Sequence, residues 1–349
     1  MKMKNFSRQD LSMSQSEMTS KSTASESELK VTGYDDKDPT DPCFIVTSPM
    51  GNILKISDTF AEMFPMWVSR ILITADTPEW ALTSATAATG FAVSIIMSPA
   101  EAGIEKTLSS SQTPDGRPGT IIQIYHRTGH ELKGQMITRL GQCVMTCPTT
   151  AAFDILEGAV KKLKVGKSLS LFGDGFQKKD NISGHVVWRI PVMEGEFLIE
   201  SKFGVKRGVA GGNFLILAKD KKAGLTSAEA AAKAIREKCD GAVLTFPGGI
   251  CRSGSKVGSM KYKLPASTNH PFCPILRGVA PDSQIPEGVN SVYELVINGL
   301  DLKSVKKAMT EGIKASAGIP GVVKITAANY GGKLGPYQAH LKEILQLEK

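Results

Sequence analysis

An internal duplication constrains the fold of this sequence more than any other feature. Short apolar runs predict strands, alanine-rich stretches predict helices, and the same order, βαββαβ, occurs twice. The first copy is predicted at residues 70–75, 78–89, 91–97, 120–125, 131–140 and 143–146. The second copy is predicted at residues 214–218, 226–239, 242–246, 292–297, 302–316 and 322–326. A capping box at Thr226 predicts the start of its first helix.

Split βαβ units of this order form an antiparallel sheet that two helices cover on one side, the ferredoxin-like arrangement. The predicted fold class is therefore α+β, with two tandem ferredoxin-like lobes packed as α/β sandwiches. A length of 349 residues suits two domains. We expect the first lobe to span residues 51–200, including connecting strands at 186–190 and 196–199, and the second to span 201–349.

The amino-terminal region has a different composition. Its first 30 residues contain ten Ser or Thr and few large apolar side chains, so they cannot bury enough surface to offset the entropy of ordering. The first convincing apolar strand begins at Cys43. We therefore expect residues 1–50 to form a disordered extension, with the folded body beginning between residues 43 and 57. Acidic residues within it argue against a targeting peptide.

Charge and cysteine content narrow the function classes. Lysine and arginine total 42 against 34 acidic residues, a net charge of +8, which favours anionic partners. Zinc-finger spacing and surface aromatic motifs are missing, so small acidic molecules are expected rather than nucleic acid. Six scattered cysteines fit a reducing, cytoplasmic location, and no apolar run is long enough to span a membrane.

Loops rich in glycine and proline carry the candidate chemistry. The most distinctive runs from residue 246 to 259, and others lie at 98–105, 112–119, 211–214 and 327–336. Exposed backbone amides in such loops can bind a phosphate, a carboxylate or a developing oxyanion. The 246–259 loop matches neither the P-loop nor the dinucleotide-binding pattern. A flexible connector is the alternative interpretation.

Glu294 interrupts an apolar strand. Alternation places it on one face with Val292 and Val296, while the other face is apolar throughout. Desolvation there would raise the pKa of the carboxyl toward the range useful for proton transfer. An edge strand or a buried pair with lysine are the alternatives. The five histidines and the Cys143–Cys147 spacing do not predict a metal site.

Many of these segments together resemble one family, the formylmethanofuran:tetrahydromethanopterin formyltransferases. The resemblance covers residue 58 to the carboxyl end and is carried by the segments 58–65, 99–105, 113–119, 141–146, 173–175, 209–214, 246–250, 253–259, 266–269, 272–274 and 329–335. It implies two ferredoxin-like lobes, a homotetramer, no metal and no bound prosthetic group. Residues 1 to about 50 have no counterpart in it.

The resemblance also implies the reaction, a reversible formyl transfer between the primary amine of methanofuran and N5 of tetrahydromethanopterin through a tetrahedral intermediate. Glu294 matches the family's catalytic carboxylate. The expected carrier and oxyanion contacts are Gly248, Gly249, Ser253, Ser255, Lys256, Asn213, Ser267 and Asn269. The sequences of several loops are closer to those of the bacterial members of the family. This resemblance favours the bacterial direction, from the pterin to methanofuran in formaldehyde oxidation, with formyl-hydrolase subunits as partners. The methanogenic direction, a non-catalytic subunit of a formyl-hydrolysing complex and a nucleic-acid-binding module are the alternatives.

Overall fold

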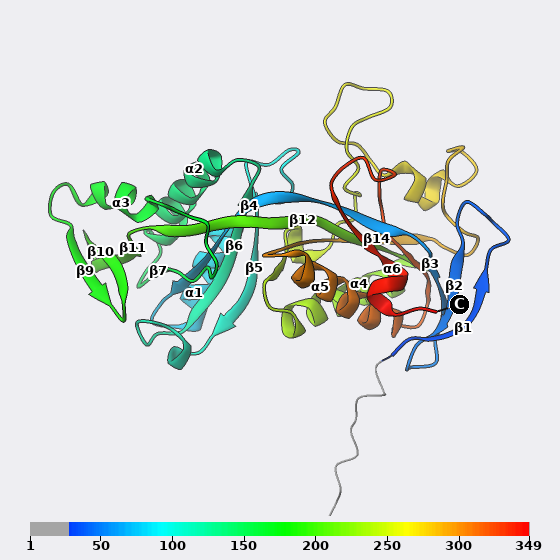
Figure 1. Ribbon diagram of the computed structural model, residues 1–349, viewed down its shortest axis with the longest axis horizontal. Coiled ribbons are helices and arrows are strands. Elements are labelled where there is room, and N and C mark those ends of the chain that lie inside the picture. The colour runs from blue at the N-terminus through cyan, green and yellow to red at the C-terminus, as the bar shows by residue number, and fades with distance from the viewer. Residues whose placement is uncertain (1–27, 349) are drawn as a thin grey trace, which may run out of the picture.

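The computed structural model describes residues 28–348. Within these residues, sixteen strands form one connected sheet. Two long strands, β4 (Phe60–Thr74) and β12 (Phe203–Ala218), connect the two halves of the elongated molecule (Figure 1). They pair antiparallel along their middle, from Val68 opposite Lys206 to Phe64 opposite Ala210. Each of these strands therefore begins in one half of the sheet and ends in the other.

The first half contains the predicted order βαββαβ. Its sheet has the strand order β7-β4-β6-β5, and every neighbouring pair is antiparallel. After β4 its elements are α1 (Pro78–Thr89), β5 (Glu101–Leu108), β6 (Gly119–His126), α2 (Gly129–Arg139) and β7 (Ala151–Asp154).

The second half repeats this arrangement. Its strand order is β15-β12-β14-β13, again antiparallel throughout. After β12 its elements are α4 (Lys221–Lys238), β13 (Ala242–Leu244), β14 (Ser291–Gly299), α5 (Leu302–Ala317) and β15 (Val322–Thr326). The long insertion between its second and third strands, residues 245–290, contains only short 3₁₀ turns in place of helices or strands.

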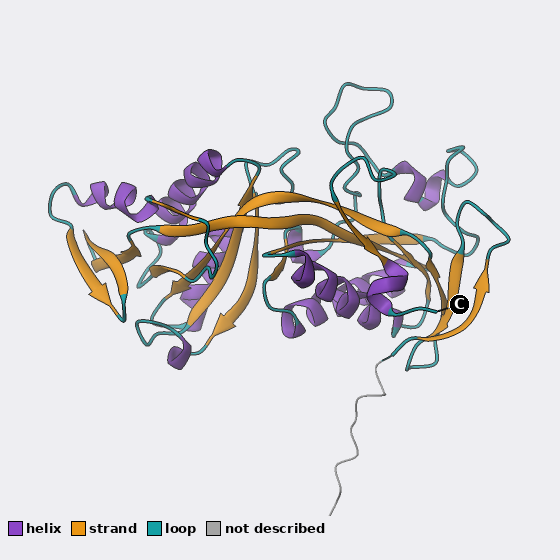
Figure 2. Ribbon diagram, in the orientation of Figure 1, coloured by secondary structure: helices purple, strands orange, loops and turns teal. Residues whose placement is uncertain are grey.

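Each half has its own core between sheet and helices (Figure 2). In the second half, Ala231 and Ile235 of α4 and Met309 of α5 pack with Phe214 and Ile297 of the sheet. Alanine on the inner face of α4 allows a close approach of helix to sheet, which explains the alanine-rich composition that predicted the helix.

The predicted strand at 91–97 is wrong, and the strand lies later, at β5. Residues 91–97 form turns instead, because Ser98 closes a loop by donating its N–H and hydroxyl to the Ser94 carbonyl at 2.8 and 2.7 Å. The β5 strand uses small residues because it packs against β13. A Cβ on Gly103 would lie 2.8 Å from the Leu244 carbonyl oxygen.

Two other boundaries differ from the sequence prediction. The strand expected at 143–146 is part of a wide helical turn, Leu140–Val144, and the strand is β7. The second-half helix begins earlier than the box at Thr226, because Asp220 caps it by accepting the Ala223 N–H at 2.8 Å. At 143–146 the backbone continues the preceding helix, because the Met145 N–H donates to the Leu140 carbonyl at 2.8 Å.

The predicted disorder of residues 1–50 is wrong for its described part. Residues 30–57 form an antiparallel meander, β1 (Lys30–Asp35), β2 (Cys43–Thr47) and β3 (Ile53–Ser57), which joins the second half through parallel pairing of β3 with β15. Phe44 and Val46 are fully buried. These apolar residues provide the burial that the polar composition seemed to exclude. The rest of the predicted extension, residues 1–27, lies outside the described residues.

The remaining elements complete the sheet edges. The predicted connecting strands are confirmed as a hairpin of β10 (His185–Val192) and β11 (Gly195–Glu200). Smaller elements are β8 (Lys161–Leu163), α3 (Val165–Leu169), β9 (Lys178–Ile182), β16 (Tyr337–His340) and α6 (Leu341–Leu345). Within residues 28–348, no helix is both long and apolar enough to cross a membrane.

Candidate active site

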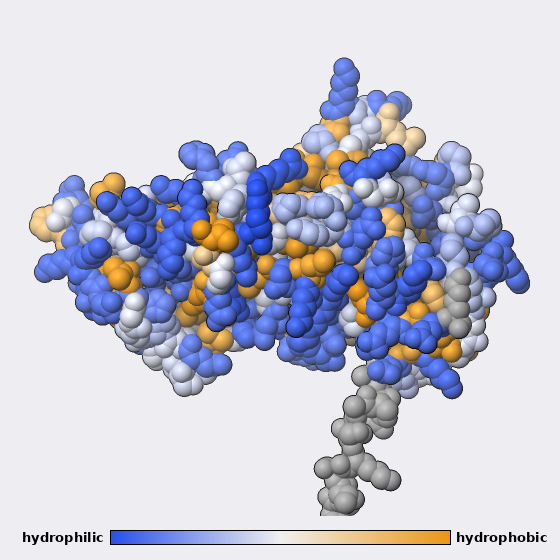
Figure 3. Space-filling model, in the orientation of Figure 1, coloured by the Kyte–Doolittle hydropathy of each residue, from blue (hydrophilic) through white to orange (hydrophobic). Residues whose placement is uncertain are grey.

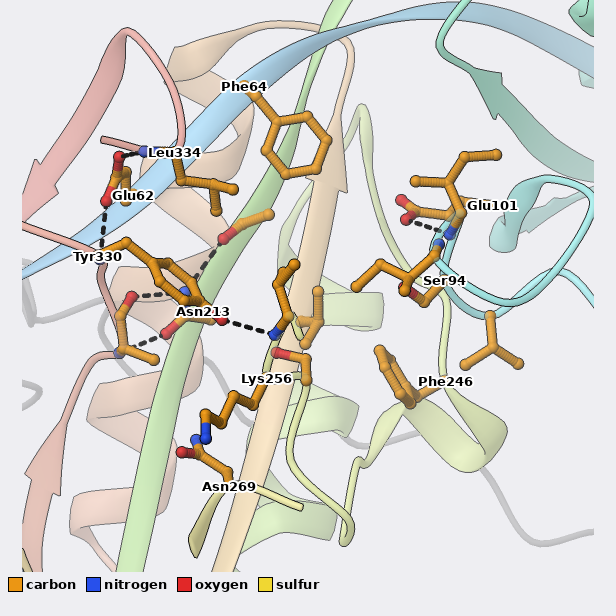
Figure 4. Close-up of a pocket in the computed structure, with 18 of the residues that line it drawn as sticks. Glu62, Phe64, Ser94, Glu101, Asn213, Phe246, Lys256, Asn269, Tyr330 and Leu334 are labelled. Atoms are coloured by element: carbon orange, nitrogen blue, oxygen red, sulfur yellow. Dashed lines mark hydrogen bonds between the residues drawn. The ribbon is translucent and has the colours of Figure 1, made fainter. Parts of the chain in front are cut away.

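A cavity lies where the two halves of the molecule meet (Figure 4). Its empty volume is about 850 Å³, including the open mouth. The first half contributes the 93–96 turn, Glu101 and Arg127, and the second half contributes Gly211, Asn213 and the 246–269 loop. Because the long strands cross this point, side chains of both halves converge on one space.

Glu294 and Ser255 form the most chemically distinctive pair of the site. The Ser255 N–H donates to Glu294 Oε2 at 2.8 Å, and the Ser255 hydroxyl donates to Oε1 at 2.6 Å. Glu294 is 2% exposed, and this burial raises the pKa of its carboxyl, although the two Ser255 hydrogen bonds oppose the rise. Glu294 does not line the cavity itself, but Ser255 does. The hydroxyl is therefore the connection between the carboxyl and the cavity.

The backbone around Glu294 holds this pair in place. Cys251 and Glu294 form an isolated antiparallel bridge, with N–H to carbonyl distances of 2.8 and 2.9 Å. The Tyr330 hydroxyl accepts the Val257 N–H at 2.7 Å from the opposite side of the cavity. The 246–259 loop is thereby fixed both to β14 and to the carboxyl-terminal loop.

Glu62 of β4 organises that carboxyl-terminal loop. Its carboxylate accepts four backbone N–H groups, from Tyr330, Gly332, Leu334 and Gly335. Burial by itself would raise the pKa of Glu62, but the four donors outweigh it and the pKa is lowered. This carboxylate shapes the 330–335 loop, and its lone pairs are already occupied.

Asn213 connects β12 with the same loop. Its side-chain oxygen accepts the Ala328 N–H at 2.7 Å, and its amide group donates to the carbonyls of Gly211 and Ala328, both at 3.1 Å. Asn213 lines the cavity, yet its hydrogen bonds serve the backbone.

Glu101 is a second buried carboxyl that lines the cavity. It accepts the Ile95 N–H at 2.9 Å and the Asn298 side-chain amide at 2.6 Å, so it joins the first half to β14. Burial raises its pKa, and these two hydrogen bonds together with the charge of Arg127 oppose the rise.

Lys256 has a fixed position in the cavity wall. Its Nζ lies 3.1 Å from His270 Nδ1, and His270 Nε2 lies 2.8 Å from the Asp282 carboxylate. The Asp282 carboxylate accepts a hydrogen bond from the protonated Nε2 of His270. Nδ1 of His270 is therefore left to accept a hydrogen bond from the Lys256 ammonium. This chain of three side chains within one long loop holds a positive charge in the cavity wall.

The structure brings together part of the predicted site. Of the predicted residues, Ser255, Lys256, Asn213 and Asn269 line the cavity. Gly248 and Gly249 form a 3₁₀ turn instead, in which the Gly249 N–H donates to the Phe246 carbonyl at 2.8 Å. The remaining two, Ser253 and Ser267, hydrogen-bond within the loop.

Sequence reasoning did not assign Glu62, Glu101 or Arg127 to the site. Glu62 lies between Ala61 and Met63 in an apolar strand, which is the pattern that identified Glu294 and could have identified it as well. Glu101 was placed in a loop because its strand is made of small residues. Nothing in the sequence near Arg127 distinguishes it from a surface arginine.

The arrangement is suited to acyl transfer between two bound carriers. A buried carboxyl can exchange a proton through the Ser255 hydroxyl, and the Lys256 ammonium and backbone amides can stabilise negative charge on oxygen. Among residues 28–348, no group of three His, Cys, Asp or Glu side chains could hold a metal ion. Fold and site together define an acyltransferase-like cleft between two related halves.

Comparison with protein families identifies the chain. Residues 50–192 match the model described as formylmethanofuran-tetrahydromethanopterin formyltransferase, and residues 195–344 match its proximal lobe. The chain belongs to the formylmethanofuran:tetrahydromethanopterin formyltransferase family. It is 58% identical to the enzyme of that name from Methanocaldococcus jannaschii and 50% to that from Archaeoglobus fulgidus, over 84% of this chain and 99% of each relative.

Solved structures agree with this assignment. The formyltransferase from Methanosarcina barkeri has a TM-score of 0.81 at 50% identity, covering 84% of this chain and 99% of that one. A chain of the formyltransferase/hydrolase complex of Methylorubrum extorquens, solved with methylofuran, has a TM-score of 0.80 at 43% identity, covering 84% and 97%. The overall sequence identity to these archaeal relatives is thus higher than the identity to the bacterial chain, although the sequences of several loops favoured the bacterial members of the family.

Proposed function

We propose that this chain catalyses reversible transfer of a formyl group between the primary amine of methanofuran and N5 of tetrahydromethanopterin, with both carriers as substrates and no permanently bound cofactor. Family membership supports the reaction. The single structural observation that carries the mechanism is the double hydrogen bond from Ser255 to the buried Glu294 carboxyl, beside a cavity between the two halves.

The reaction needs proton transfer at two nitrogens. The amine attacks the formyl carbon, the carbonyl electron pair moves to oxygen, and a tetrahedral adduct forms. The amine proton passes to the Ser255 oxygen while the Ser255 hydroxyl proton passes to Glu294. Collapse of the adduct breaks the bond to N5, and Glu294 returns a proton to N5 through the same hydroxyl. Atoms and charges balance without a further reactant.

The adduct oxygen needs stabilisation while it carries negative charge. Lys256 provides a fixed cation in the cavity wall, and Asn269 adds an amide close by. Both carriers end in acidic groups, which the net charge of +8 suits. We assign Lys256 to this oxygen or to an acidic carrier group, and Gly248, Gly249, Ser253 and Ser267 to the shape of the loop.

The physiological direction in the proposal is from the pterin to methanofuran, in formaldehyde oxidation. A catalyst lowers the barrier equally in both directions, so the same site serves the methanogenic direction when carrier concentrations favour it. The similarity to a chain of a formyltransferase/hydrolase complex supports hydrolase subunits as partners in the cytoplasm.

The proposal includes the architecture. We take each half as a ferredoxin-like lobe, residues 51–200 and 201–349 with β3 as an added strand of the second lobe, because the strand orders β7-β4-β6-β5 and β15-β12-β14-β13 are those of split βαβ units. A homotetramer is supported by exposed apolar side chains in the 246–290 loop, where apolar surface gathers below the projecting tip (Figure 3). These side chains include Val257, Met260, Leu264, Ile275 and Val279.

A turnover assay tests the function. Purified protein supplied with formyl-tetrahydromethanopterin and methanofuran should deformylate the pterin, with formylmethanofuran appearing in equal amount. Omitting methanofuran is the control and should abolish the deformylation of the pterin. Release of formate in place of formylmethanofuran would exclude the proposal, and no turnover with a folded protein would exclude it and leave the non-catalytic subunit.

A further inference from the structure

Glu101 is a buried carboxyl in the cavity wall that the proton transfers described above do not use. It is 5% exposed and lies at the start of β5, on the side of the cavity that the first half forms. Figure 4 shows it beside the 93–96 turn, away from the Lys256 side. A carboxyl in such a place needs a reason, because burial without full hydrogen bonding is unfavourable.

The hydrogen bonds of Glu101 leave capacity for a ligand. A carboxylate can accept about four hydrogen bonds, and Glu62 uses this capacity fully through four backbone N–H groups. Among residues 28–348, Glu101 accepts only two, one on each oxygen, from Ile95 and Asn298. Each oxygen of Glu101 therefore has a free acceptor site, and the side chain borders the cavity.

The carboxyl of Glu101 is also held in a fixed orientation. Asn298 is fully buried, donates its amide to Glu101 at 2.6 Å and accepts the Gly211 N–H at 3.2 Å. The Gly211 contact fixes which end of the Asn298 amide faces Glu101. The two free acceptor sites are preorganised for a ligand with two neighbouring donors.

The cavity around Glu101 suits a flat ring. Aromatic and aliphatic side chains line it, including Phe64, Phe246, Ile95 and Val296. A pterin carries N3–H and a 2-amino group side by side on its pyrimidine ring, which matches the two oxygens of one carboxylate. We infer that Glu101 is a specificity-determining residue that binds this donor edge of tetrahydromethanopterin, an assignment that rests on the proposed function.

The inferred contact also orients the reacting atom. N5 belongs to the second ring of the pterin, remote from the N3 and 2-amino edge. Holding that edge at Glu101 turns N5 away from the first half and toward the loop that contains Ser255 and Lys256. The alternative ligand for Glu101 is the ammonium of methanofuran, which would change the affinity for the other carrier.

Glu101→Gln tests the inference by comparing the two carriers. Gln replaces one acceptor oxygen by a donor that faces the donors of the pterin, so KM for the pterin substrate should rise at least about tenfold. KM for methanofuran should stay within about twofold. Glu200→Gln is the matched control, because Glu200 is also buried with a raised pKa but is paired with His185 outside the cavity. It should leave both values unchanged.

Changing the ligand in place of the protein distinguishes recognition of the 2-amino group by Glu101 from a structural effect of the Glu101→Gln substitution. We would measure binding of 6-methyltetrahydropterin, and of an analogue with methyl in place of the 2-amino group, by calorimetry. Wild type should prefer the parent compound at least about tenfold, and this preference should disappear in Glu101→Gln and persist in Glu200→Gln. Glu101→Asp, which keeps the charge, should retain part of it.

Two results would overturn the inference. One is an equal preference for the 2-amino compound in wild type and Glu101→Gln, and the other is a rise confined to KM for methanofuran. Failure of the proposed function is recognised separately, because wild type would then show no formyl transfer while calorimetry still reported pterin binding.

Discussion

Ser255 donates both its backbone N–H and its hydroxyl to the carboxyl of Glu294, at 2.8 and 2.6 Å. The two residues come from different elements, a glycine-rich loop and the central strand β14. The loop amide and hydroxyl thus reach a carboxyl that the strand keeps away from water. Removing one member of this pair should change the chemistry without dismantling the fold.

Ser255→Ala should shift the pH dependence of turnover. Hydrogen bonds to a carboxylate lower its pKa, so removing the hydroxyl raises the already elevated pKa of Glu294 further. The limb of the kcat profile that reports this carboxyl should move to higher pH, and kcat should fall because the proton route is lost. Ser259→Ala, in the same loop, is the control, since its hydroxyl oxygen only accepts the Tyr262 N–H.

Lys256→Met should reduce kcat/KM by about tenfold to a hundredfold, because hydrogen bonds to charged groups contribute about 1.5–3 kcal/mol. The loss should be smaller at high salt, where the ammonium is screened. Lys263→Met removes the same charge from an exposed position of the same loop and should change kcat/KM little. Equal losses in the two variants would show that only the net charge matters.

Asp41 and Lys324 link the amino-terminal meander to the body. The ammonium of Lys324 is almost fully buried and pairs with the Asp41 carboxylate. Asp41→Ala leaves that charge unpaired, so we expect a loss of about 3 kcal/mol or more and a melting temperature several degrees lower. Adding Lys324→Met should recover most of the loss. If the double variant is no more stable than the single one, the pair does not hold the meander.

Deleting residues 1–42 should likewise lower the melting temperature, because it removes β1 and Asp41. A deletion of residues 1–27 is the matched control, since it leaves β1, Asp41 and all other described residues in place. Calorimetry of the two truncated proteins beside the full chain makes the comparison.

Glu62 should make stability depend on acid pH. Its pKa in the folded protein lies below the ordinary value of 4.5, so its stabilisation is fully present above pH 4.5 and is lost as pH falls through the folded pKa. At pH 7, Glu62→Gln should cost about 1–3 kcal/mol, because some of the four N–H donors lose their acceptor. Urea unfolding at pH 7 and pH 3.5 should show the difference from wild type shrinking at the lower pH. A constant difference would contradict this account.

The fold was predictable to the extent that it depends on local pattern. Alternation and alanine content located α1, α5, β14 and β15 within a few residues. The strand β5 was not predictable, because Gly103 is there to fit against Leu244, a contact between the two halves. The meander of residues 30–57 depends on its pairing with β15, far along the chain.

The site was predictable in the same uneven way. Glu294 was conspicuous as one carboxyl in an apolar strand, and Lys256 lies in the glycine-rich loop 246–259, whereas Asn269 was expected only from the family resemblance. Glu101 could not be identified, because its partner Asn298 lies 197 residues away and its burial depends on how the halves dock. Long-range contacts of this kind leave no local trace in a single sequence.

The kcat of Glu294→Gln, with both carriers saturating, tests the central claim most directly. Gln keeps the size of the side chain and removes the exchangeable proton. General acid–base catalysis contributes about 10²–10⁴-fold, so kcat should fall by about that factor while KM for both carriers stays within about twofold. The melting temperature should change little, because Gln takes one acceptor away from the two Ser255 donors but also removes the cost of ionising a buried carboxyl. A folded variant whose kcat stays within about threefold of wild type would contradict the account, since the proton would then travel without Glu294.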